Sequence, residues 1–168
     1  MKIDLGCGNY PRGDIGVTLK QNTAVCNATP HLDKYLEPYG FVYNPKAQII
    51  YDDLENYIQI NYPTLKGQEI LMCHILEHLT CPYCILSALD KAKMIVIVTP
   101  NARVNDADKT DKTHIYSFTE WSLENLINAV FKADYKIYKI EKDLDLLAVI
   151  YPCVLLKHTP YRMFNVDI

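Results

Sequence analysis

Three histidines, at positions 74, 78 and 114, are the side chains of this sequence best suited to move a proton. An imidazole titrates near neutral pH, which is the property that a general acid or base needs. His74 directly follows an apolar run, and His114 follows a polar stretch after a later run. We predict His74 and His114 as candidate catalytic bases, with a structural role as an equal alternative for His114. For His78 we favour the structural role.

A metal site is a second chemistry open to the same stretch. His74, His78, Cys81 and Cys84 form an H-x3-H-x2-C-x2-C pattern, and imidazole and thiolate are good zinc ligands. Such spacing can share one helix face, but Pro82 interrupts a helix between the two cysteines. We therefore expect no metal here. Whether Cys81 and Cys84 are thiols, a disulfide or metal ligands stays open.

Glycines and carboxylates follow two other apolar runs. Gly6-Cys7-Gly8 ends the first run, and glycines at such a place let the backbone turn sharply and approach a ligand closely. Asp52-Asp53-Leu54 ends a later run, where a carboxylate either binds a ligand or caps a helix. Taken alone, each motif is more often an ordinary turn or cap.

Regular elements must position these residues, and the apolar periodicity predicts them. Runs of strand length recur and predict strands at residues 3–5, 15–19, 47–51, 69–73 and 94–99. The last of these, MIVIVT, is apolar on both faces, as a central parallel strand should be. All the chemical motifs therefore lie at the carboxyl ends of predicted strands.

Helical patterns and a closing hairpin complete the prediction. We expect helices over 82–92 and 119–132, the second with Thr119 as its N-cap. Apolar runs at 135–142 and 146–157, separated by a short turn, predict an antiparallel hairpin. Alternating strands and helices form an α/β fold with a mostly parallel sheet covered on both faces. In such sheets, ligands bind outside the carboxyl ends of the strands.

Length and composition fit one globular domain that spans residues 1–168. Apolar residues make up 49% of the chain and charged residues 22%, and the formal charge is −3. This charge argues against a broad nucleic-acid surface. The first residues, MKIDLGCG, contain no apolar run long enough for a signal peptide or a membrane helix. We expect a cytoplasmic protein that does not associate with a membrane.

Together, the motifs resemble class I S-adenosylmethionine-dependent methyltransferases, in the branch with a Leu-Glu-His motif after the fourth strand. The stretches that match are 3–8, 53–54, 74–79, 99–101 and 113–118. The resemblance implies a Rossmann-like three-layer sandwich with a sheet of the seven-stranded type. It also implies S-adenosylmethionine as cofactor and methyl transfer to an acceptor, small or macromolecular, that the sequence does not identify.

The resemblance assigns parts of the cofactor to particular residues. The methionine part would lie against Asp4, Gly6, Cys7 and Gly8, and Asp4 would either orient the loop or meet the amino group. The adenine would lie against Asp52, Asp53 and Leu54. The sulfonium and its methyl group would lie beside Cys73 and His74.

The sequence departs from this family at the second strand. The family has an acidic residue at the end of that strand, which accepts hydrogen bonds from both ribose hydroxyls, and the matching residue here is Thr18. One hydroxyl is a weaker acceptor than a carboxylate. Only six residues separate Gly8 from Ile15, too few for a crossover helix, so the first helix must be missing or reduced.

These observations favour a methyltransferase and leave one rival of another class. A degenerate domain of the same fold could bind a nucleoside or a partner protein without catalysis, and the threonine and the lost helix would suit it. A metal-stabilised structural module is a third class. We also expect that the apolar C-terminal strands could mediate a homodimer.

Overall fold

The structure is a computed structural model that describes residues 1–19, 29–106, 109 and 111–152. Its centre is one sheet of seven strands in the order β3-β2-β1-β4-β5-β7-β6. The strand bounds are β1 Lys2–Leu5, β2 Ile15–Thr18, β3 Gln48–Tyr51, β4 Glu69–Cys73, β5 Met94–Pro100, β6 Asp134–Ile140 and β7 Asp145–Tyr151. Every strand predicted from the sequence is present, and most bounds differ by only one or two residues.

The first five strands are parallel and the last two are antiparallel to their neighbours. β1 pairs with both β2 and β4, and β4 pairs with β5, all in parallel register. β7 inserts between β5 and β6 and runs antiparallel to both. β5 is buried along its whole length, as its continuous apolar run predicted. The fold is therefore the expected α/β sandwich with a mostly parallel sheet and a C-terminal antiparallel hairpin.

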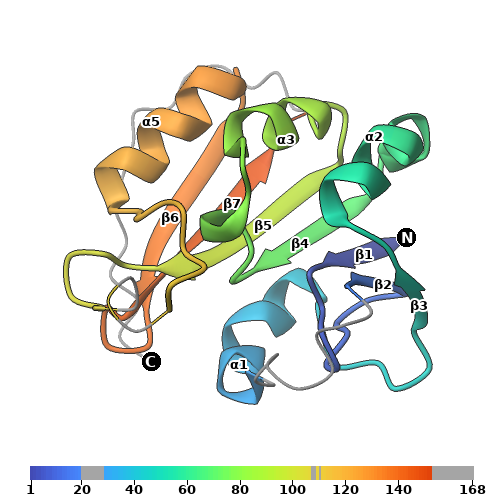
Figure 1. Ribbon diagram of the computed structural model, residues 1–168, viewed down its shortest axis with the longest axis horizontal. Helices are drawn as coiled ribbons and strands as arrows, with labels where there is room; N and C mark the ends of the chain where they lie inside the picture. Colours follow the sequence, from blue (N-terminus) through green and yellow to red (C-terminus); the bar gives the residue numbers. More distant parts are fainter. Residues whose placement is uncertain (20–28, 107–108, 110, 153–168) are drawn as a thin grey trace.

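Helices cover the two faces of the sheet unequally. α2 (Leu54–Leu65), α3 (Pro82–Ala88) and α5 (Glu120–Val130) lie over one face, as Figure 1 shows. The larger core cluster fills the space beneath these helices. On the other face, residues 30–39 form three short helical pieces, η2 (Pro30–Leu32), α1 (Asp33–Leu36) and η3 (Glu37–Tyr39). A second cluster joins these pieces to the sheet through Leu32, Leu36 and Phe41.

Two predicted boundaries need correction, and one predicted helix cap is confirmed. The helix predicted over 82–92 ends at Ala88. The last strand ends at Tyr151, and the end of its predicted range, 153–157, lies outside the described residues. Thr119 does cap α5, and its side chain and that of Ser122 form a reciprocal capping box.

The connection from β1 to β2 lacks a helix, as the short spacing predicted. Residues 6–14, all of which are described, form only turns and bends. A hydrogen bond from the Asp14 amide to the Lys2 carbonyl, at 2.9 Å, returns the chain to the start of the sheet. Among the described residues, no helix is both long and apolar enough to cross a lipid bilayer.

Candidate functional site

The candidate site lies where the strand order of the sheet reverses. β1 is followed along the chain by its neighbour β2 on one side, whereas β4 lies on its other side. A sheet of this kind opens a crevice at the carboxyl ends of the strands on either side of such a switch point. The segments that follow β1 and β4 begin with Gly6 and His74. The fold thus brings the glycine loop and the histidine segment to one edge (Figure 1).

The glycine loop requires glycine for two separate reasons. Gly6 has a φ of +85° and Gly8 a φ of +54°, both in the left-handed region that other residues avoid. A Cβ on Gly6 would also lie 2.8 Å from Cγ1 of Ile75, in the loop after β4. The amides of Gly6 and Cys7 both donate to the Val17 carbonyl, at 2.8 and 3.2 Å. The two loops of the crevice therefore touch each other at Gly6.

Cys7 contributes backbone rather than side chain to this loop. Its thiol is directed at Gly16 of β2, where a Cβ would lie only 2.6 Å from its sulfur. The side chain is buried. Of the residues expected to meet a ligand at this loop, Cys7 can therefore offer only its peptide group, whereas Gly6 and Gly8 shape the turn.

Asp4 is a fully buried acid that holds the glycine loop in place. Its Oδ2 accepts a hydrogen bond of 2.8 Å from the Arg12 amide, across the whole turn. Its Oδ1 is buried and accepts no hydrogen bond within the described part of the chain. Burial raises the pKa of Asp4 to about 7, although the Arg12 amide and guanidinium oppose the shift. This supports the first of its two predicted roles, orienting the loop.

Arg12 is a buried charge that the sequence patterns did not single out. Its Nε lies 2.7 Å from Oδ1 of Asp33 in α1, and the exposed fraction of its side chain is 3%. Another guanidinium nitrogen donates to the carbonyl of Thr29, at 2.6 Å, and to its hydroxyl. The phenol of Tyr10 donates to the same Asp33 carboxylate. Through this ion pair and these hydrogen bonds, Arg12 holds the segment of α1 at the carboxyl edge of the sheet.

The two acidic residues after β3 accept hydrogen bonds from the first turn of α2. Asp53 is the N-cap of α2, and its Oδ1 accepts a hydrogen bond from the Asn56 amide at 3.1 Å. Asp52 accepts one from the Asn56 side chain at 2.9 Å. Leu54 points into the core. The capping alternative holds for these residues, and both carboxylates remain partly or fully exposed at the site edge.

Thr18 and Cys73 end the strands on either side of β1. Thr18 is buried at the end of β2, and its carbonyl accepts from the Asp52 amide at 3.1 Å. Cys73 ends β4, and its sulfur lies 4.0 Å from the hydroxyl of Thr29. Burial raises the pKa of the Cys73 thiol to about 12. Cys73 is therefore a neutral thiol at physiological pH, unsuited to act as a nucleophile.

His74 lies between two buried carboxylates. Its Nδ1 is 3.5 Å from Oε1 of Glu77, and its Nε2 is 3.8 Å from Oδ1 of Asp145. Burial lowers the pKa of His74, but the contact with Glu77 and the charge of Asp145 outweigh it and raise the pKa above its ordinary value. The backbone of His74 has a φ of +51°, a strained value for a residue other than glycine. The two carboxylates therefore favour the protonated imidazole of His74 at the carboxyl end of β4.

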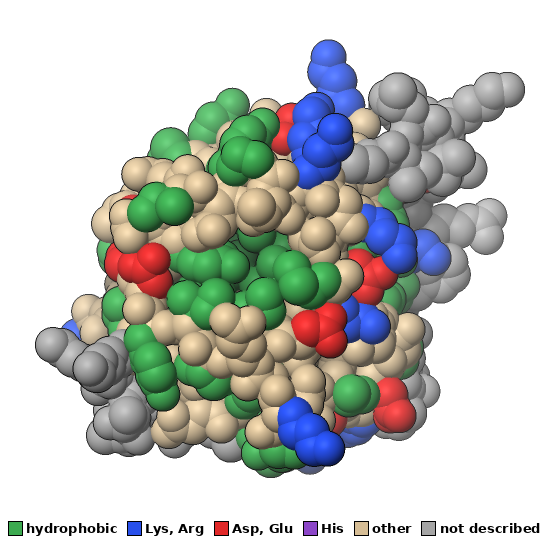
Figure 2. All heavy atoms as spheres, turned by 90° about the vertical axis from the view of Figure 1, so that its right-hand side faces the viewer, with side chains coloured by type: hydrophobic (Ala, Val, Ile, Leu, Met, Phe, Trp, Pro, Cys, Tyr) green, Lys and Arg blue, Asp and Glu red, His purple; other side chains and the backbone are tan. Residues whose placement is uncertain are grey.

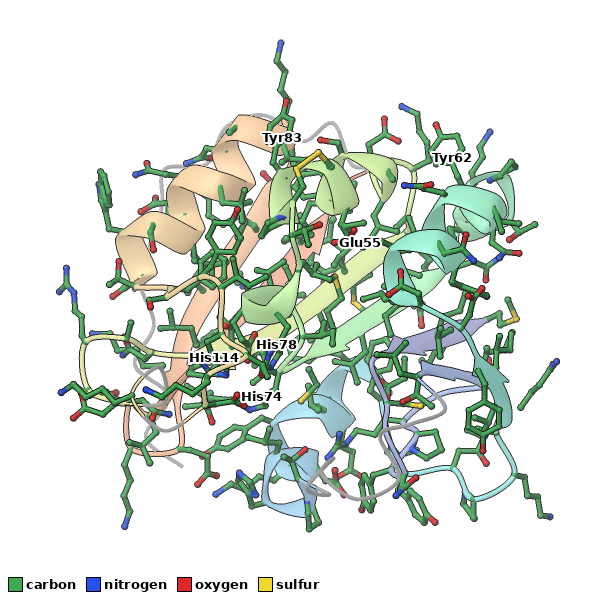
Figure 3. All side chains as sticks on the ribbon, in the orientation of Figure 1. Glu55, Tyr62, His74, His78, Tyr83 and His114 are labelled. Atoms are coloured by element: carbon green, nitrogen blue, oxygen red, sulfur yellow. A yellow bond between two sulfur atoms is a disulfide. The ribbon has the colours of Figure 1, made fainter. Side chains whose placement is uncertain are left out.

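His114 lies beside His78, so the two histidines that sequence reasoning treated separately form one cluster. Their ring centroids are 4.7 Å apart in an edge-to-face arrangement. Both rings lie near His74 at the carboxyl end of β4, as Figure 3 shows. The amides of Ile115 and Tyr116 donate to the Glu77 carbonyl at 2.9 and 3.1 Å and hold the His114 segment against η4 (Leu76–His78).

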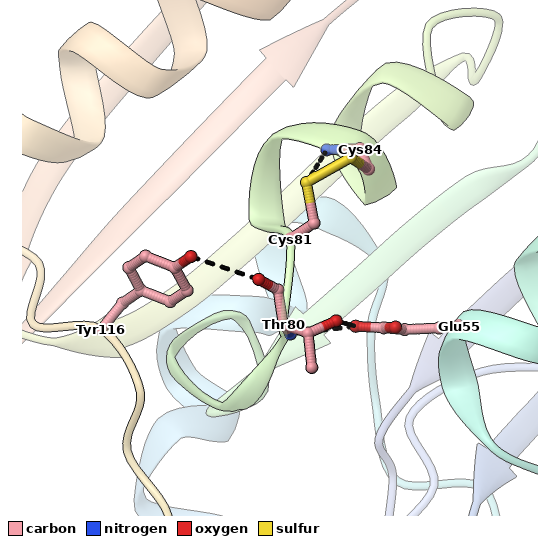
Figure 4. Close-up of a disulfide and its surroundings, with 5 residues drawn as sticks. All are labelled: Glu55, Thr80, Cys81, Cys84 and Tyr116. Carbon is pink, nitrogen blue, oxygen red and sulfur yellow. Dashed lines mark hydrogen bonds between the residues drawn. A yellow bond between two sulfur atoms is a disulfide. The ribbon is translucent and has the colours of Figure 1, made fainter.

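The cysteine half of the H-x3-H-x2-C-x2-C pattern is absent from this cluster. Cys81 and Cys84 form a disulfide at the start of α3 (Figure 4). Next to it, the amide of Thr80 donates to Oε1 of Glu55 in α2 at 2.9 Å, and the phenol of Tyr116 donates to the Thr80 carbonyl. The set of His74, His78, Cys81 and Cys84 is therefore not a metal site in this structure.

A hollow lies between the glycine loop, the residues that precede β3 and β3 itself. It has a volume of about 200 Å³ and is lined by Gly8, Asn9, Pro11, Tyr43, Pro45, Ala47, Ile49 and Tyr51. Ile50, which alternates with Ile49 along β3, packs instead against the larger core. Viewed from the side of α2 and β3, the molecule shows hydrophobic side chains gathered around a hollow, with acidic and basic groups at its rim (Figure 2).

Sequence reasoning missed Arg12, Glu77 and Asp145 as site residues. Asp145 was placed in a turn, but it begins β7 and faces His74 with a nearly buried carboxylate. Glu77 was part of a matched motif, yet nothing in its spacing indicated that it would be 1% exposed. The sequence did carry one signal for Arg12. Arg12 belongs to the short turn between Gly6 and Ile15, and a turn of this length keeps it close to the edge of the sheet.

Comparisons with known proteins identify the fold. No protein-family model matches the sequence, and neither does any curated protein. Among solved structures, a SAM dependent methyltransferase from Archaeoglobus fulgidus is similar, with a TM-score of 0.56 and 17% identity over 89% of this chain and 85% of that one. A putative methyltransferase from Bacillus halodurans gives a TM-score of 0.54, with 10% identity over 90% and 91% of the two chains.

A third similar structure carries ligands. It is the plantazolicin methyltransferase BamL in complex with a triazolic desmethylPZN analog and SAH, with a TM-score of 0.55. It is 13% identical over 90% of this chain and 76% of that one. At such identities the likeness establishes the fold, which is the methyltransferase-like Rossmann fold that the sequence motifs predicted.

Proposed function

We propose that this chain is an S-adenosylmethionine-dependent methyltransferase whose cofactor lies across the carboxyl ends of β1 and β4. The observation that carries the proposal is the Gly6-Cys7-Gly8 loop at the switch point of a methyltransferase-like sheet. Similar structures include several methyltransferases, one of them bound to SAH. The Leu-Glu-His stretch at 76–78 lies in the same crevice and supports the same family.

The residues at this edge fit the methionine part of such a cofactor. Oδ1 of Asp4 is buried and lacks a hydrogen bond within the described residues. An amino group is the kind of donor that would satisfy it. The turn at Gly6 and Gly8 would leave backbone groups close to the ligand. Asp53 and the hollow beside Gly8 would receive the adenine and ribose.

The chemistry asks little of the protein. S-adenosylmethionine supplies a methyl group on a good, uncharged leaving group, so the protein mainly has to align the acceptor and exclude water. A base is needed only when the acceptor carries a proton at neutral pH. His74 would take that role, because its two neighbouring carboxylates, Glu77 and Asp145, would stabilise the imidazolium that forms.

One observation favours a second candidate, a non-catalytic nucleoside-binding domain. Thr18 stands where a carboxylate would bind the ribose, and its side chain is buried. A site that has lost this charge loses a strong hydrogen-bond acceptor. The two candidates differ in their affinity for the sulfonium cofactor.

Calorimetric titration of the full chain with S-adenosylmethionine and S-adenosylhomocysteine tests the proposal. We expect both to bind with micromolar dissociation constants, at one site per chain. Thr18→Asp would restore the missing acceptor, and we expect it to tighten binding about tenfold, the effect of a charge-assisted hydrogen bond. Absence of binding at millimolar ligand, in the wild type and in Thr18→Asp, would contradict the proposal.

A further inference from the structure

We infer that Glu77, His78 and His114 form a binding site for one divalent transition-metal ion. One donor atom from each of these side chains lies within 4.8 Å of the donor atoms of the other two. An ion with bonds of about 2.1 Å holds tetrahedral ligands about 3.4 Å apart, so a movement of under about 1 Å by each donor atom would close the site. The three residues come from two segments that the backbone already holds together.

The buried carboxylate of Glu77 is the observation that most favours a cation site here. Its Oε2 accepts a hydrogen bond from the Thr99 hydroxyl at 3.1 Å. Its Oε1 is buried and accepts no hydrogen bond within the described part of the chain, and its ion-pair partner, Nδ1 of His74, lies 3.5 Å away. A buried carboxylate is costly unless it is paired or coordinates a metal. A cation between Glu77 and the two other histidines would supply what this oxygen lacks.

Hydrogen bonds fix His78 in the tautomer that a metal needs. Its Nδ1 lies 3.2 Å from the Thr113 carbonyl, which can only accept, and 3.0 Å from the Thr113 hydroxyl. That hydroxyl donates to Oδ1 of Asp111 at 2.6 Å, so toward His78 it also accepts. The proton therefore lies on Nδ1 of His78, and Nε2 carries the lone pair. Histidines that bind metals typically donate the other ring nitrogen in this way.

Asp111 also orients the third ligand. Its Oδ2 lies 3.7 Å from Nε2 of His114, whose side chain is only 6% exposed. One carboxylate thus supports both histidines, directly at His114 and through Thr113 at His78. Such supporting groups are a regular part of metal sites.

The donor set indicates the kind of ion. Two imidazoles and one carboxylate suit Mn²⁺, Fe²⁺, Co²⁺ or Zn²⁺, whereas Mg²⁺ and Ca²⁺ prefer oxygen ligands alone. Three protein ligands leave positions open for water or another ligand. The site differs from the H-x3-H-x2-C-x2-C pattern at which the sequence led us to expect no metal, because it shares only His78 with that pattern.

Titration of the metal-free full chain with Co²⁺ tests the inference, followed by visible absorption and calorimetry. We expect one Co²⁺ per chain, with d–d bands of nitrogen and oxygen ligands and without the charge-transfer bands of thiolates. Glu77→Gln and His114→Gln should abolish binding. Thr113→Val removes one acceptor for Nδ1 of His78 and should weaken binding about tenfold to a hundredfold. The matched control, His31→Gln, changes an exposed histidine outside the cluster and should bind Co²⁺ like the wild type.

Circular dichroism of each variant separates loss of the site from loss of the fold. Should Glu77→Gln fail to fold, His114→Gln and Thr113→Val carry the test. Failure of the wild type to bind Co²⁺ at millimolar concentration would overturn the inference, and so would binding that survives both ligand substitutions in folded protein. Cofactor titration of the same samples keeps this result apart from the proposed function, because neither test requires the other to succeed.

Discussion

At the scale of single residues, Asp53 caps α2, and we propose that it also binds the adenine of the cofactor. We predict that Asp53→Ala weakens binding of S-adenosylmethionine about tenfold, because an acceptor for the adenine is lost. The same change removes the N-cap of α2 and should lower the free energy of unfolding by about 1 kcal/mol. Calorimetry and urea denaturation measure the two effects.

Asp53→Asn is the matched variant, because asparagine caps a helix as well as aspartate does. We expect it to keep the stability of the wild type and to bind the cofactor more weakly. If Asp53→Asn bound the cofactor as tightly as the wild type, the carboxylate would act only as a cap, and the predicted place of the adenine would be wrong.

A buried acid makes stability depend on pH, and Asp4 supplies the prediction. Its pKa is about 7 in the folded chain against 3.8 ordinarily, so between these values the folded chain holds a proton that the unfolded chain has lost. The free energy of unfolding should therefore fall as the pH rises through this window. From about pH 5 to pH 8 we expect Asp4 to contribute a loss on the order of 3 kcal/mol.

Asp4→Asn isolates this contribution, because its amide oxygen can still accept from the Arg12 amide. Urea denaturation at several pH values should give a flatter profile for Asp4→Asn than for the wild type. Parallel profiles of the two proteins would show that Asp4 does not titrate in this range.

At the scale of elements, the contact between the glycine loop and the loop after β4 can be measured. Gly6→Ala adds a methyl group in the left-handed region and against Ile75, and we expect a loss of stability of about 2–4 kcal/mol. Gly67→Ala is the control, since Gly67 has a φ of +73° but nothing within 4 Å of an added Cβ. Gly67→Ala should lower the free energy of unfolding by only about 1–2 kcal/mol, the strain of a left-handed backbone conformation.

A double mutant completes the test of this loop contact. Ile75→Ala removes Cγ1 and Cδ1, the two nearest of the three Ile75 atoms that a Cβ on Gly6 would meet, so Gly6→Ala should destabilise that background less than the wild type. If Gly6→Ala lowered the free energy of unfolding equally in the wild type and in Ile75→Ala, the two loops would not be in contact at Gly6.

The elements also show which parts of the fold the sequence could predict. The five parallel strands carry continuous apolar runs, and α5 has both a cap and helical spacing, so local patterns sufficed for them. α2 was missed, and it contains Pro63 and many polar residues. The pieces at 30–39 were missed because none exceeds four residues and each depends on packing against the sheet.

The sequence could predict where the candidate site lies better than it could predict which side chains contact each other there. Gly6, His74 and Asp53 follow strands and could be placed at one edge by topology alone. Glu77, Asp145 and Arg12 become site residues only through contacts between distant segments, such as the one between Asp145 and His74. Periodicity and spacing carry no information about such contacts.

At the scale of the whole molecule, the expected homodimer through the C-terminal strands stays a prediction. β6 is an edge of the sheet, and its Lys136 is exposed. Lysines on edge strands counter pairing with a second copy, and salt screens their repulsion. We therefore expect weak dimerisation that strengthens with ionic strength, measurable by sedimentation equilibrium. A monomer at all concentrations and salt levels would contradict it.

The position of β7 has a consequence for how the chain reaches its fold during synthesis. β5, apolar along its whole length, pairs on one side with β4, made earlier, and on the other with β7, the last described strand to leave the ribosome. Until β7 arrives, the most hydrophobic strand keeps an open edge, and such edges recruit other chains. A nascent chain stalled before residue 145 should therefore be the species most in need of a chaperone.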